Sequence, residues 1–392
     1  MNTFQFSSPT KVLFGAGKVA ETGAAVQSAG GSRVLVLYGR NSAINSGILS
    51  AVLATLDEYG LSYFAEGSIQ PNPRVARAQE LVDRYAQQDI DFVLGVGGAS
   101  VLDTCKAVAM GLWGGSPIWD YFSKTRPVTG SLPVGCVLTI AAAGSETSDS
   151  AVLTNEALSI KRGCSTPFNR PVFAILDPET TYTLPSYQTA CGVADIMLHT
   201  MERYFGTNAG QNQITDGIAE ALLRDVIENG KRALEHPSDY QARSELMWCG
   251  SLSHNDLTGL GRNKDFSVHQ LGHPLSAVYD LAHGASLTAI WPHWARYVAD
   301  SDPERFAHLG RTVFFLSESN DRLAAVATIK SFAHYWGILG LPTCLRDCIG
   351  IQSDDTLRNL ARLCSFEGTR TIGTFRELTE TDMLSIYRMA NH

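Results

Sequence analysis

The sequence predicts two domains, an α/β nucleotide-binding domain at residues 1–182 and an all-helical domain at residues 183–392. Three observations lead to this fold class. Short apolar runs alternate with helical patterns in the first half, long helical patterns take over after Thr180, and the turn-rich segment 177–181 separates the two regions. A length of 392 residues also fits two domains with their own cores.

In the first half, four runs rich in β-branched residues predict buried strands, at residues 34–38, 92–94, 134–139 and 172–176. Residues 73–88 and 100–112 have apolar positions spaced as in amphipathic helices. Strands that alternate with helices form a parallel sheet with helices on its faces. Ligands of such sheets bind at the carboxyl ends of the strands, so we expect a ligand site there.

In the second half, residues 216–234 and 323–335 show long helical patterns. We therefore expect a helical domain after residue 182. A cleft between two domains is the usual location of a binding site, and we expect the site of this protein there.

Composition excludes several classes of protein. There are 31 Lys and Arg against 39 Asp and Glu, a net charge of -8 that disfavours nucleic acid and anionic lipid as partners. No window approaches the ~20 apolar residues of a membrane span, and the first residues lack the pattern of a signal peptide. The eight cysteines include no CxxC pair and are interpreted as reduced thiols. We predict a soluble, cytoplasmic protein.

Five residues of the second half are candidates for a metal site. Asp195 and His199 are four apart in a helical pattern, so both side chains emerge on one face. His269 and His273 are again four apart, and His283 follows a predicted helix break. One carboxylate with two or three imidazoles suits Zn²⁺ or Fe²⁺ better than Ca²⁺ or Mg²⁺. The alternative is that each histidine is an ordinary core or surface residue.

A glycine-rich segment, GVGGASVLDTCK at residues 95–106, follows the predicted strand 92–94 and opens the next helix. Glycines there let the backbone approach a pyrophosphate at a helix N-terminus, where free N–H groups favour anions. The segment is neither a P-loop nor a GxGxxG fingerprint, and a tight turn without ligand is the alternative. Gly15 and Gly17 are interpreted as a turn.

The residues after the predicted strand 34–38 bear on the choice of cofactor. They are Gly39, Arg40, Asn41 and Ser42, with no acidic residue to bind a ribose 2′-hydroxyl. An arginine with small polar groups suits a 2′-phosphate, which favours NADP(H) over NAD(H). The alternative is that Arg40 is a solvated loop residue.

Several long strings resemble those of the iron-dependent (group III) alcohol dehydrogenases, and within them the NADPH-dependent butanol dehydrogenase and aldehyde reductase subgroup. They extend nearly from end to end: SSPTKVLFGAGKV, QPNPR, GGASVLDTCK, LTIAAAGSETSDSAVLTN, PVFAILDPETTYTLP, GVADIMLHTMERYF, HQLGHPLSAVYDLAHG and RELTETDMLSIYRMA. The resemblance implies a dehydroquinate-synthase-like fold.

The resemblance also implies roles for individual residues. Asp195, His199, His269 and His283 match the family's metal ligands, and His273 matches a histidine near the nicotinamide and the substrate. Further positions lie in segments that match the family's cofactor-binding segments. They are Asn72, Pro73, Gly97, Gly98, Ala99, Ser100, Asp103, Thr139, Ser145 and Lys161, and they add to the four cofactor candidates at 39–42.

Two positions depart from the family pattern. Ala99 replaces the third glycine of the usual GGGS, and we expect its methyl group to be tolerated if φ is negative. AAAGSE stands where many members have TxGTGSE, which leaves open which hydroxyl contacts the nicotinamide ribose.

The activity that these features predict is metal-dependent hydride transfer between NADP(H) and short aliphatic aldehydes or primary alcohols. The metal would be Fe²⁺ or Zn²⁺, the proton would pass through His273, and Trp119, Tyr121 and Phe122 are suggested as an apolar pocket. The alternatives are an NAD-dependent polyol or glycerol dehydrogenase, a lyase of the same fold and a non-catalytic binder. The resemblance further suggests a homodimer, with residues 4–8 crossing between subunits.

Overall fold

The computed structural model describes residues 1–115, 117–207 and 212–392. Its main sheet has six strands, all parallel, in the order β1-β8-β5-β4-β2-β3. The strands are β1 (Lys11–Phe14), β2 (Arg33–Tyr38), β3 (Ser62–Glu66), β4 (Phe92–Gly97), β5 (Val134–Leu138) and β8 (Phe173–Leu176). The predicted strands are present as β2, β4, β5 and β8, which confirms the predicted parallel sheet.

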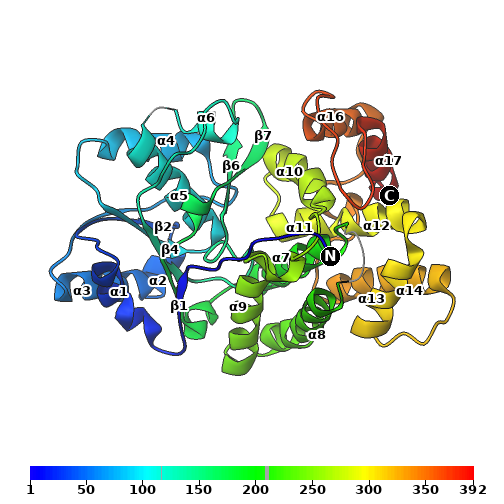
Figure 1. Cartoon of the computed structure of the whole chain (residues 1–392), viewed down its shortest axis with the longest axis horizontal. Helices are drawn as coiled ribbons and strands as arrows, with labels where there is room; N and C mark the ends of the chain where they lie inside the picture. Colours follow the sequence, from blue (N-terminus) through cyan, green and yellow to red (C-terminus); the bar gives the residue numbers. More distant parts are fainter. Residues whose placement is uncertain (116, 208–211) are drawn as a thin grey trace. The chain divides into compact units, whose positions relative to one another are not determined.

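Helices cover both faces of this sheet (Figure 1). Leu35 and Leu37 of β2 pack on the side of α4 (Val75–Tyr85) and α5 (Ala99–Gly114), whereas Val34 and Val36 pack on the side of α1 (Thr22–Ser28) and α3 (Ile48–Glu58). Burial on both faces explains why β2 reads as a continuous apolar run. The helices and 3-10 turns of this part are η1 (Lys18–Glu21), α1 (Thr22–Ser28), α2 (Ser42–Asn45), α3 (Ile48–Glu58), α4 (Val75–Tyr85), α5 (Ala99–Gly114), α6 (Trp119–Phe122), η2 (Pro167–Asn169) and η3 (Pro178–Thr181).

An antiparallel pair that the sequence analysis did not predict follows β5. It consists of β6 (Ser150–Asn155) and β7 (Ile160–Ser165), with Thr154 opposite Lys161. Ala151 and Leu153 enter the same hydrophobic core as α4 and α5. The pair is short and mixes polar with apolar residues, so it gives a weak strand pattern.

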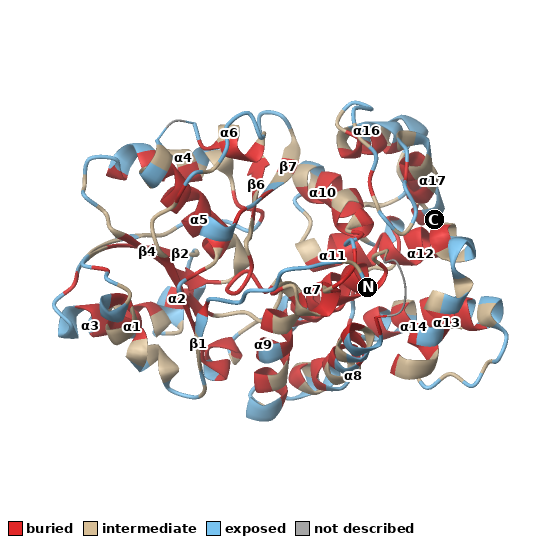
Figure 2. Cartoon of the chain, viewed as in Figure 1, coloured by how far each residue is buried: buried red, intermediate tan, exposed pale blue. Residues whose placement is uncertain are grey.

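The rest of the chain is helical, as predicted. The elements are α7 (Ser186–Tyr204), α8 (Gln213–Glu235), α9 (Tyr240–His254), η4 (Leu257–Gly259), α10 (Ser267–Tyr279), α11 (His283–Thr288), α12 (Trp291–Val298), η5 (Ala299–Ser301), α13 (Pro303–Val313), α14 (Asp321–Ile338), α15 (Arg346–Ile349), α16 (Asp354–Cys364) and α17 (Glu380–Ala390). Helix α7 is buried from Thr189 to its end (Figure 2). It packs against α8 and α11 and forms the centre of the helical part.

The chain divides into two compact units. One holds residues 7–184 together with 236–255, and the other holds residues 1–6, 185–235 and 256–392. The division after Leu184 lies close to the predicted boundary at 182, but α9 packs with the sheet unit. Met247 of α9 shares a core cluster with Leu102 and Leu138.

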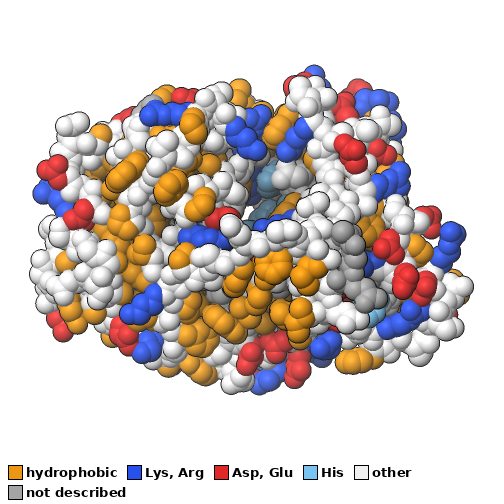
Figure 3. Space-filling model, viewed as in Figure 1, with side chains coloured by type: hydrophobic (Ala, Val, Ile, Leu, Met, Phe, Trp, Pro, Cys, Tyr) orange, Lys and Arg blue, Asp and Glu red, His pale blue; other side chains and the backbone are white. Residues whose placement is uncertain are grey.

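On the surface shown in Figure 3, basic and acidic side chains are interspersed. Within the residues that the structure describes, no helix is both long and apolar enough to cross a membrane. All eight cysteines have free thiols, seven of them buried, as the sequence predicted.

Candidate functional site

Helix α7 places two of the predicted metal ligands. Asp195 and His199 are one turn apart on it and are only 4% and 3% exposed. His199 Nδ1 lies 3.4 Å from Asp195 Oδ1. A carboxylate and an imidazole so deeply buried are costly to keep without a compensating charge or ligand.

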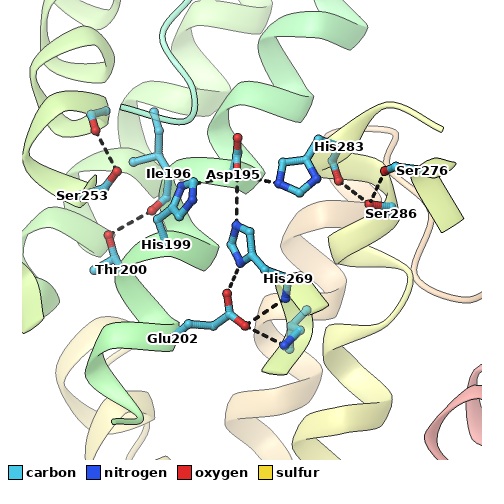
Figure 4. A network of polar contacts seen from close by, with 12 residues as sticks. Asp195, Ile196, His199, Thr200, Glu202, Ser253, His269, Ser276, His283 and Ser286 are labelled. Carbon is cyan, nitrogen blue, oxygen red and sulfur yellow. Dashed lines mark hydrogen bonds and ion pairs between the residues drawn. The ribbon is translucent and has the colours of Figure 1, made fainter. Parts of the chain in front are cut away.

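Helices α10 and α11 bring two more imidazoles to the same carboxylate oxygen. His269 Nε2 lies 3.6 Å and His283 Nε2 lies 3.9 Å from Asp195 Oδ1 (Figure 4). Ligand atoms about 2.1 Å from a tetrahedrally coordinated ion are about 3.4 Å from one another. The separations around Asp195 are close to this value.

The chemistry of these atoms also fits a divalent metal. Donor atoms of Asp195, His199 and His269 all lie within 4.8 Å of one another. Among the described residues, Asp195 Oδ1 and His269 Nε2 are buried without a hydrogen-bond partner. Buried polar atoms in native proteins are normally satisfied, so atoms without a partner that face one another indicate a missing ligand. A mixed oxygen and nitrogen set suits Fe²⁺ or Zn²⁺.

Glu202 contacts this site and is not among the residues that the sequence predicted for it. It lies on α7, two turns beyond Asp195, and is completely buried. Its Oε1 accepts hydrogen bonds from the backbone N–H groups of Val268 at 2.6 Å and His269 at 3.0 Å, and its Oε2 contacts His269 Nδ1 (Figure 4). Burial lowers the pKa of His269, but the charges of Glu202 and Asp195 outweigh burial and raise this pKa to about 9. The i, i+4, i+7 spacing places Asp195, His199 and Glu202 on one face of α7, but nothing in the sequence indicates that the start of α10 contacts Glu202.

His273, the predicted proton relay, is one turn beyond His269 on α10. It is 8% exposed, and its ring centroid is 6.2 Å from that of His283. Pro274 follows it inside the helix and has no N–H group for the carbonyl of Gln270. The thiol of Cys364 donates to that carbonyl at 3.3 Å instead. The helix therefore continues through the proline next to His273.

The predicted cofactor residues gather at one edge of the sheet. Strands β5, β4, β2 and β3 are neighbours in this order. The carboxyl end of β5 leads into Thr139, that of β4 into Gly97 and Gly98, that of β2 into residues 39–42, and that of β3 into the segment with Asn72 and Pro73. From β2 the chain adds β3 on one side and β4 on the other. Such a switch in strand order is where open α/β sheets bind nucleotides.

The glycines before α5 are required by close packing. A Cβ on Gly98 would meet Ile140 Cγ2 at 2.1 Å, and one on Gly97 would meet Val101 Cγ2 at 2.5 Å. In the described part of the chain, no side chain caps the N-terminus of α5, so its first N–H groups suit an anion. Ala99 is the first residue of α5 and is not among the residues with positive φ, so its methyl group fits the helix.

Two of the predicted cofactor residues belong to a buried network. Asp103 accepts hydrogen bonds from Ser145 Oγ at 2.7 Å and Val152 N–H at 2.9 Å, and burial raises the pKa of its carboxyl group. Lys106, which is fully buried, donates to Ser145, Ser148 and Ser150. This network fixes the loop that carries Ser145.

Three further sequence expectations lie in the same unit. Lys161 is 7% exposed, and its Nζ donates to Asn72 Oδ1 at 3.0 Å. Tyr121 and Phe122 were suggested for a substrate pocket, but both belong to the hydrophobic core. Gly15 and Gly17 have φ values of 134° and 73°, as a turn after β1 requires.

Comparisons with known proteins give one consistent result. A family model described as iron-containing alcohol dehydrogenase matches residues 9–178, and the C-terminal model of the Fe-containing alcohol dehydrogenase family matches residues 189–391. The chain is 37% identical to NADH-dependent butanol dehydrogenase A of Clostridium acetobutylicum, covering 99% of both. It is 35% identical to NADPH-dependent aldehyde reductase YqhD of Escherichia coli, covering 100% of both.

Solved structures agree. The crystal structure of NADH-dependent butanol dehydrogenase A from Thermotoga maritima superposes with a TM-score of 0.96 at 31% identity, covering 100% of this chain and 99% of that one. A structure of Escherichia coli YqhD gives a TM-score of 0.93 at 32% identity, covering 99% of both. These likenesses extend over both units of the chain.

Proposed function

This chain belongs to the iron-containing alcohol dehydrogenase family, and on that premise we propose that it interconverts short aliphatic aldehydes and primary alcohols with NADP(H) as cofactor. The family makes the chain an NAD(P)-dependent alcohol dehydrogenase that requires a divalent metal. Its relatives include butanol dehydrogenases and an aldehyde reductase. The observation that carries the proposal is the convergence of three imidazoles on the Asp195 carboxylate.

Asp195, His199, His269 and His283 would hold one Fe²⁺ or Zn²⁺ ion. When bound, such an ion polarises a carbonyl oxygen and stabilises the negative charge that develops there. The chain contributes a fixed and dry environment, because Asp195, His199 and His269 are nearly inaccessible to solvent. Charges act more strongly in such surroundings than in water.

The proposed cofactor site uses the carboxyl edge of the sheet. The nicotinamide ring supplies the hydride equivalent. The backbone at Gly97 and Gly98 receives the pyrophosphate at the N-terminus of α5. Arg40 is exposed directly after β2, where a ribose 2′-phosphate would lie, and no acidic residue stands there to repel it. The residues proposed to line the rest of the site are Gly39, Asn41, Ser42, Asn72, Pro73, Ala99, Ser100, Asp103, Thr139, Ser145 and Lys161.

His273 is the proposed proton donor to the nascent alcohol. It lies next to the metal ligands, one helical turn from His269 and near His283. An imidazole with a pKa near ~6.5 can donate and accept a proton at neutral pH. Its place on a rigid helix limits its movement relative to the metal ligands.

Turnover measurements test the proposal. Chelator-treated protein should be inactive, and protein reloaded with Fe²⁺ or Zn²⁺ should oxidise NADPH in the presence of butanal faster than NADH. A preference for NADH would match the name of the clostridial NADH-dependent butanol dehydrogenase. It would overturn the proposed preference for NADP(H) and leave the proposed reaction standing. Turnover of glycerol or other polyols with NAD⁺, without turnover of butanal, would show that the protein is a polyol dehydrogenase and not an aldehyde reductase.

We also propose a homodimer located in the cytoplasm. Phe4 and Phe6 are 47% and 45% exposed, which supports contacts of residues 4–8 with a second copy. The eight free thiols suit a reducing compartment. Light scattering of the eluted protein should give twice the chain mass of 42.4 kDa, and a mass of one chain would exclude the dimer.

A further inference from the structure

We propose that Glu202 is a positioning residue that fixes the tautomer of His269 and thereby its affinity for the metal. The inference concerns the metal site of the proposed function. It assigns a role to a residue outside the ligand set. Its test measures metal binding, so it can fail while the proposed reaction stands.

The contact with Glu202 orients the imidazole of His269. Glu202 Oε2 contacts His269 Nδ1, and the carboxylate offers only acceptors. Nδ1 therefore carries the hydrogen atom and donates it to Glu202. The other ring nitrogen, Nε2, is directed at Asp195 Oδ1, 3.6 Å away (Figure 4). The contact with Glu202 leaves the lone pair of Nε2 available to a metal.

Glu202 is itself held in place by backbone hydrogen bonds. Its Oε1 accepts from the backbone N–H groups of Val268 and His269, the second and third residues of α10. One carboxylate thus holds both the start of the helix and the ring of a residue on that helix. Full burial on α7 removes water as a competitor for these contacts. The distance between α7 and the His269 ring is therefore set by hydrogen bonds at both ends of the carboxylate.

The substitution Glu202→Gln separates the two roles of this carboxylate. An amide oxygen at Oε1 can keep the backbone bonds, but the NH₂ group then faces Nδ1 and requires it to be an acceptor. The hydrogen atom moves to Nε2, where it blocks the metal. If the amide turns over, its NH₂ group faces two backbone donors instead. Loss of such an outer contact weakens metal binding by about 10- to 100-fold.

Asp265→Asn is the matched control. Asp265 is buried and also contacts the start of α10, because its Oδ1 accepts from Ser267 N–H, but its hydrogen bonds are to backbone N–H groups and not to an imidazole. Its other oxygen accepts from the N–H groups of Thr374 and Phe375. The control therefore disturbs the same helix start through another buried carboxyl group, without touching the tautomer.

The test is the zinc dissociation constant of the full chain, measured by competition with a chromophoric chelator. Glu202→Gln should weaken binding about 10- to 100-fold, and Asp265→Asn less than about threefold. In a His269→Ala background, adding Glu202→Gln should change the constant less than about threefold. Equal losses in the two single variants, or an undiminished loss in the His269→Ala background, would show that Glu202 only stabilises the fold.

A measurement on the unmodified, zinc-loaded protein covers the case in which Glu202→Gln does not fold. In ¹⁵N-histidine spectra, His269 should show a protonated Nδ1 and a zinc-bound Nε2, with the signals assigned by their loss in His269→Ala. Zinc on Nδ1, or an Nδ1 without hydrogen, would overturn the proposal.

Discussion

Lys106 donates two hydrogen bonds to one residue, Ser145, at 2.7 Å to its carbonyl oxygen and 2.8 Å to its hydroxyl oxygen. The carbonyl oxygens of Ser148 and Ser150 lie 3.1 Å and 2.7 Å from the same nitrogen, so its three N–H groups are shared among four acceptors. A single buried cation thus holds the loop between β5 and β6, which carries a predicted cofactor residue. Burial lowers the pKa of Lys106, and the charges of Asp103 and Glu146 oppose this shift.

Replacing this cation should destabilise the protein. Lys106→Met leaves several carbonyls without their donor and the Asp103 carboxyl group without the positive charge near it, so we expect the free energy of unfolding to fall by about 3–5 kcal/mol. Urea denaturation measures it. Lys231→Met is the control, because Lys231 is 60% exposed and pairs with Glu235 within its own helix, and it should cost under about 0.5 kcal/mol. A loss of that size for Lys106→Met would contradict the role assigned to the buried cation.

Metal binding should stabilise the fold through Asp195. With zinc at about 100 times its dissociation constant, linkage predicts a gain of about 2.7 kcal/mol in the free energy of unfolding. Asp195→Asn should abolish this gain at the same zinc concentration, because an amide oxygen is a weaker ligand than a carboxylate. Thermal unfolding with and without zinc measures the gain. Asp355→Asn, a change at an exposed position on α16, should keep it. An unchanged zinc effect in Asp195→Asn would place the metal elsewhere.

Arg40 should determine the preference between the two cofactors. Arg40→Asp removes the cation after β2 and repels a 2′-phosphate, so kcat/KM for NADPH should fall about 10- to 100-fold while that for NADH changes much less. Steady-state kinetics with butanal measure both values. Arg322→Asp makes the same charge change at an exposed position on α14 and should leave the ratio unaltered. Parallel losses with both cofactors would exclude the 2′-phosphate contact.

His293 should make stability depend on pH. Burial lowers the pKa of this residue to about 4, although its hydrogen bond to the Thr343 carbonyl opposes the shift. The unfolded chain takes up a proton near pH ~6.5, whereas the folded chain does so only near pH 4. Stability is therefore lost as pH falls, by about 2 kcal/mol between pH 7 and pH 5.

His293→Gln should remove this part of the pH dependence. Urea denaturation at pH 7 and pH 5 gives the difference for the unmodified protein and the variant. His334→Gln changes an exposed histidine and should leave the difference as it is. If His293→Gln keeps the full loss, other groups are responsible for it.

Much of the fold follows from local patterns in the sequence. The central strands β2 and β4 could be predicted because both their faces are buried, which makes their buried positions a continuous apolar run. The spacing of Asp195 and His199 likewise follows from the turn of a helix. The pair β6 and β7 could not be predicted with the same rules, because its residues alternate between a core and a polar surface over a few positions.

What could not be predicted depends on contacts between distant segments. Glu202 gains its role only when the start of α10 arrives beside α7. In the sequence, Glu202 is one of many acidic residues on helices. The apolar side of α9 shows that something covers it, but not that Leu102 and Leu138 of the sheet unit do so. A periodic pattern shows which face of a helix is buried, but it does not show which segment packs against that face.

The placement of α9 in the sheet unit has a consequence for synthesis on the ribosome. The nascent chain has completed all strands of the sheet by Leu176, yet the helix that covers Leu102 and Leu138 is translated only with residues 240–254. Helices α7 and α8, which belong to the other unit, emerge in the interval. Until then, an apolar surface of the sheet unit faces water or a chaperone. A gene fragment that ends at the apparent domain boundary would encode a protein in which this surface is never covered.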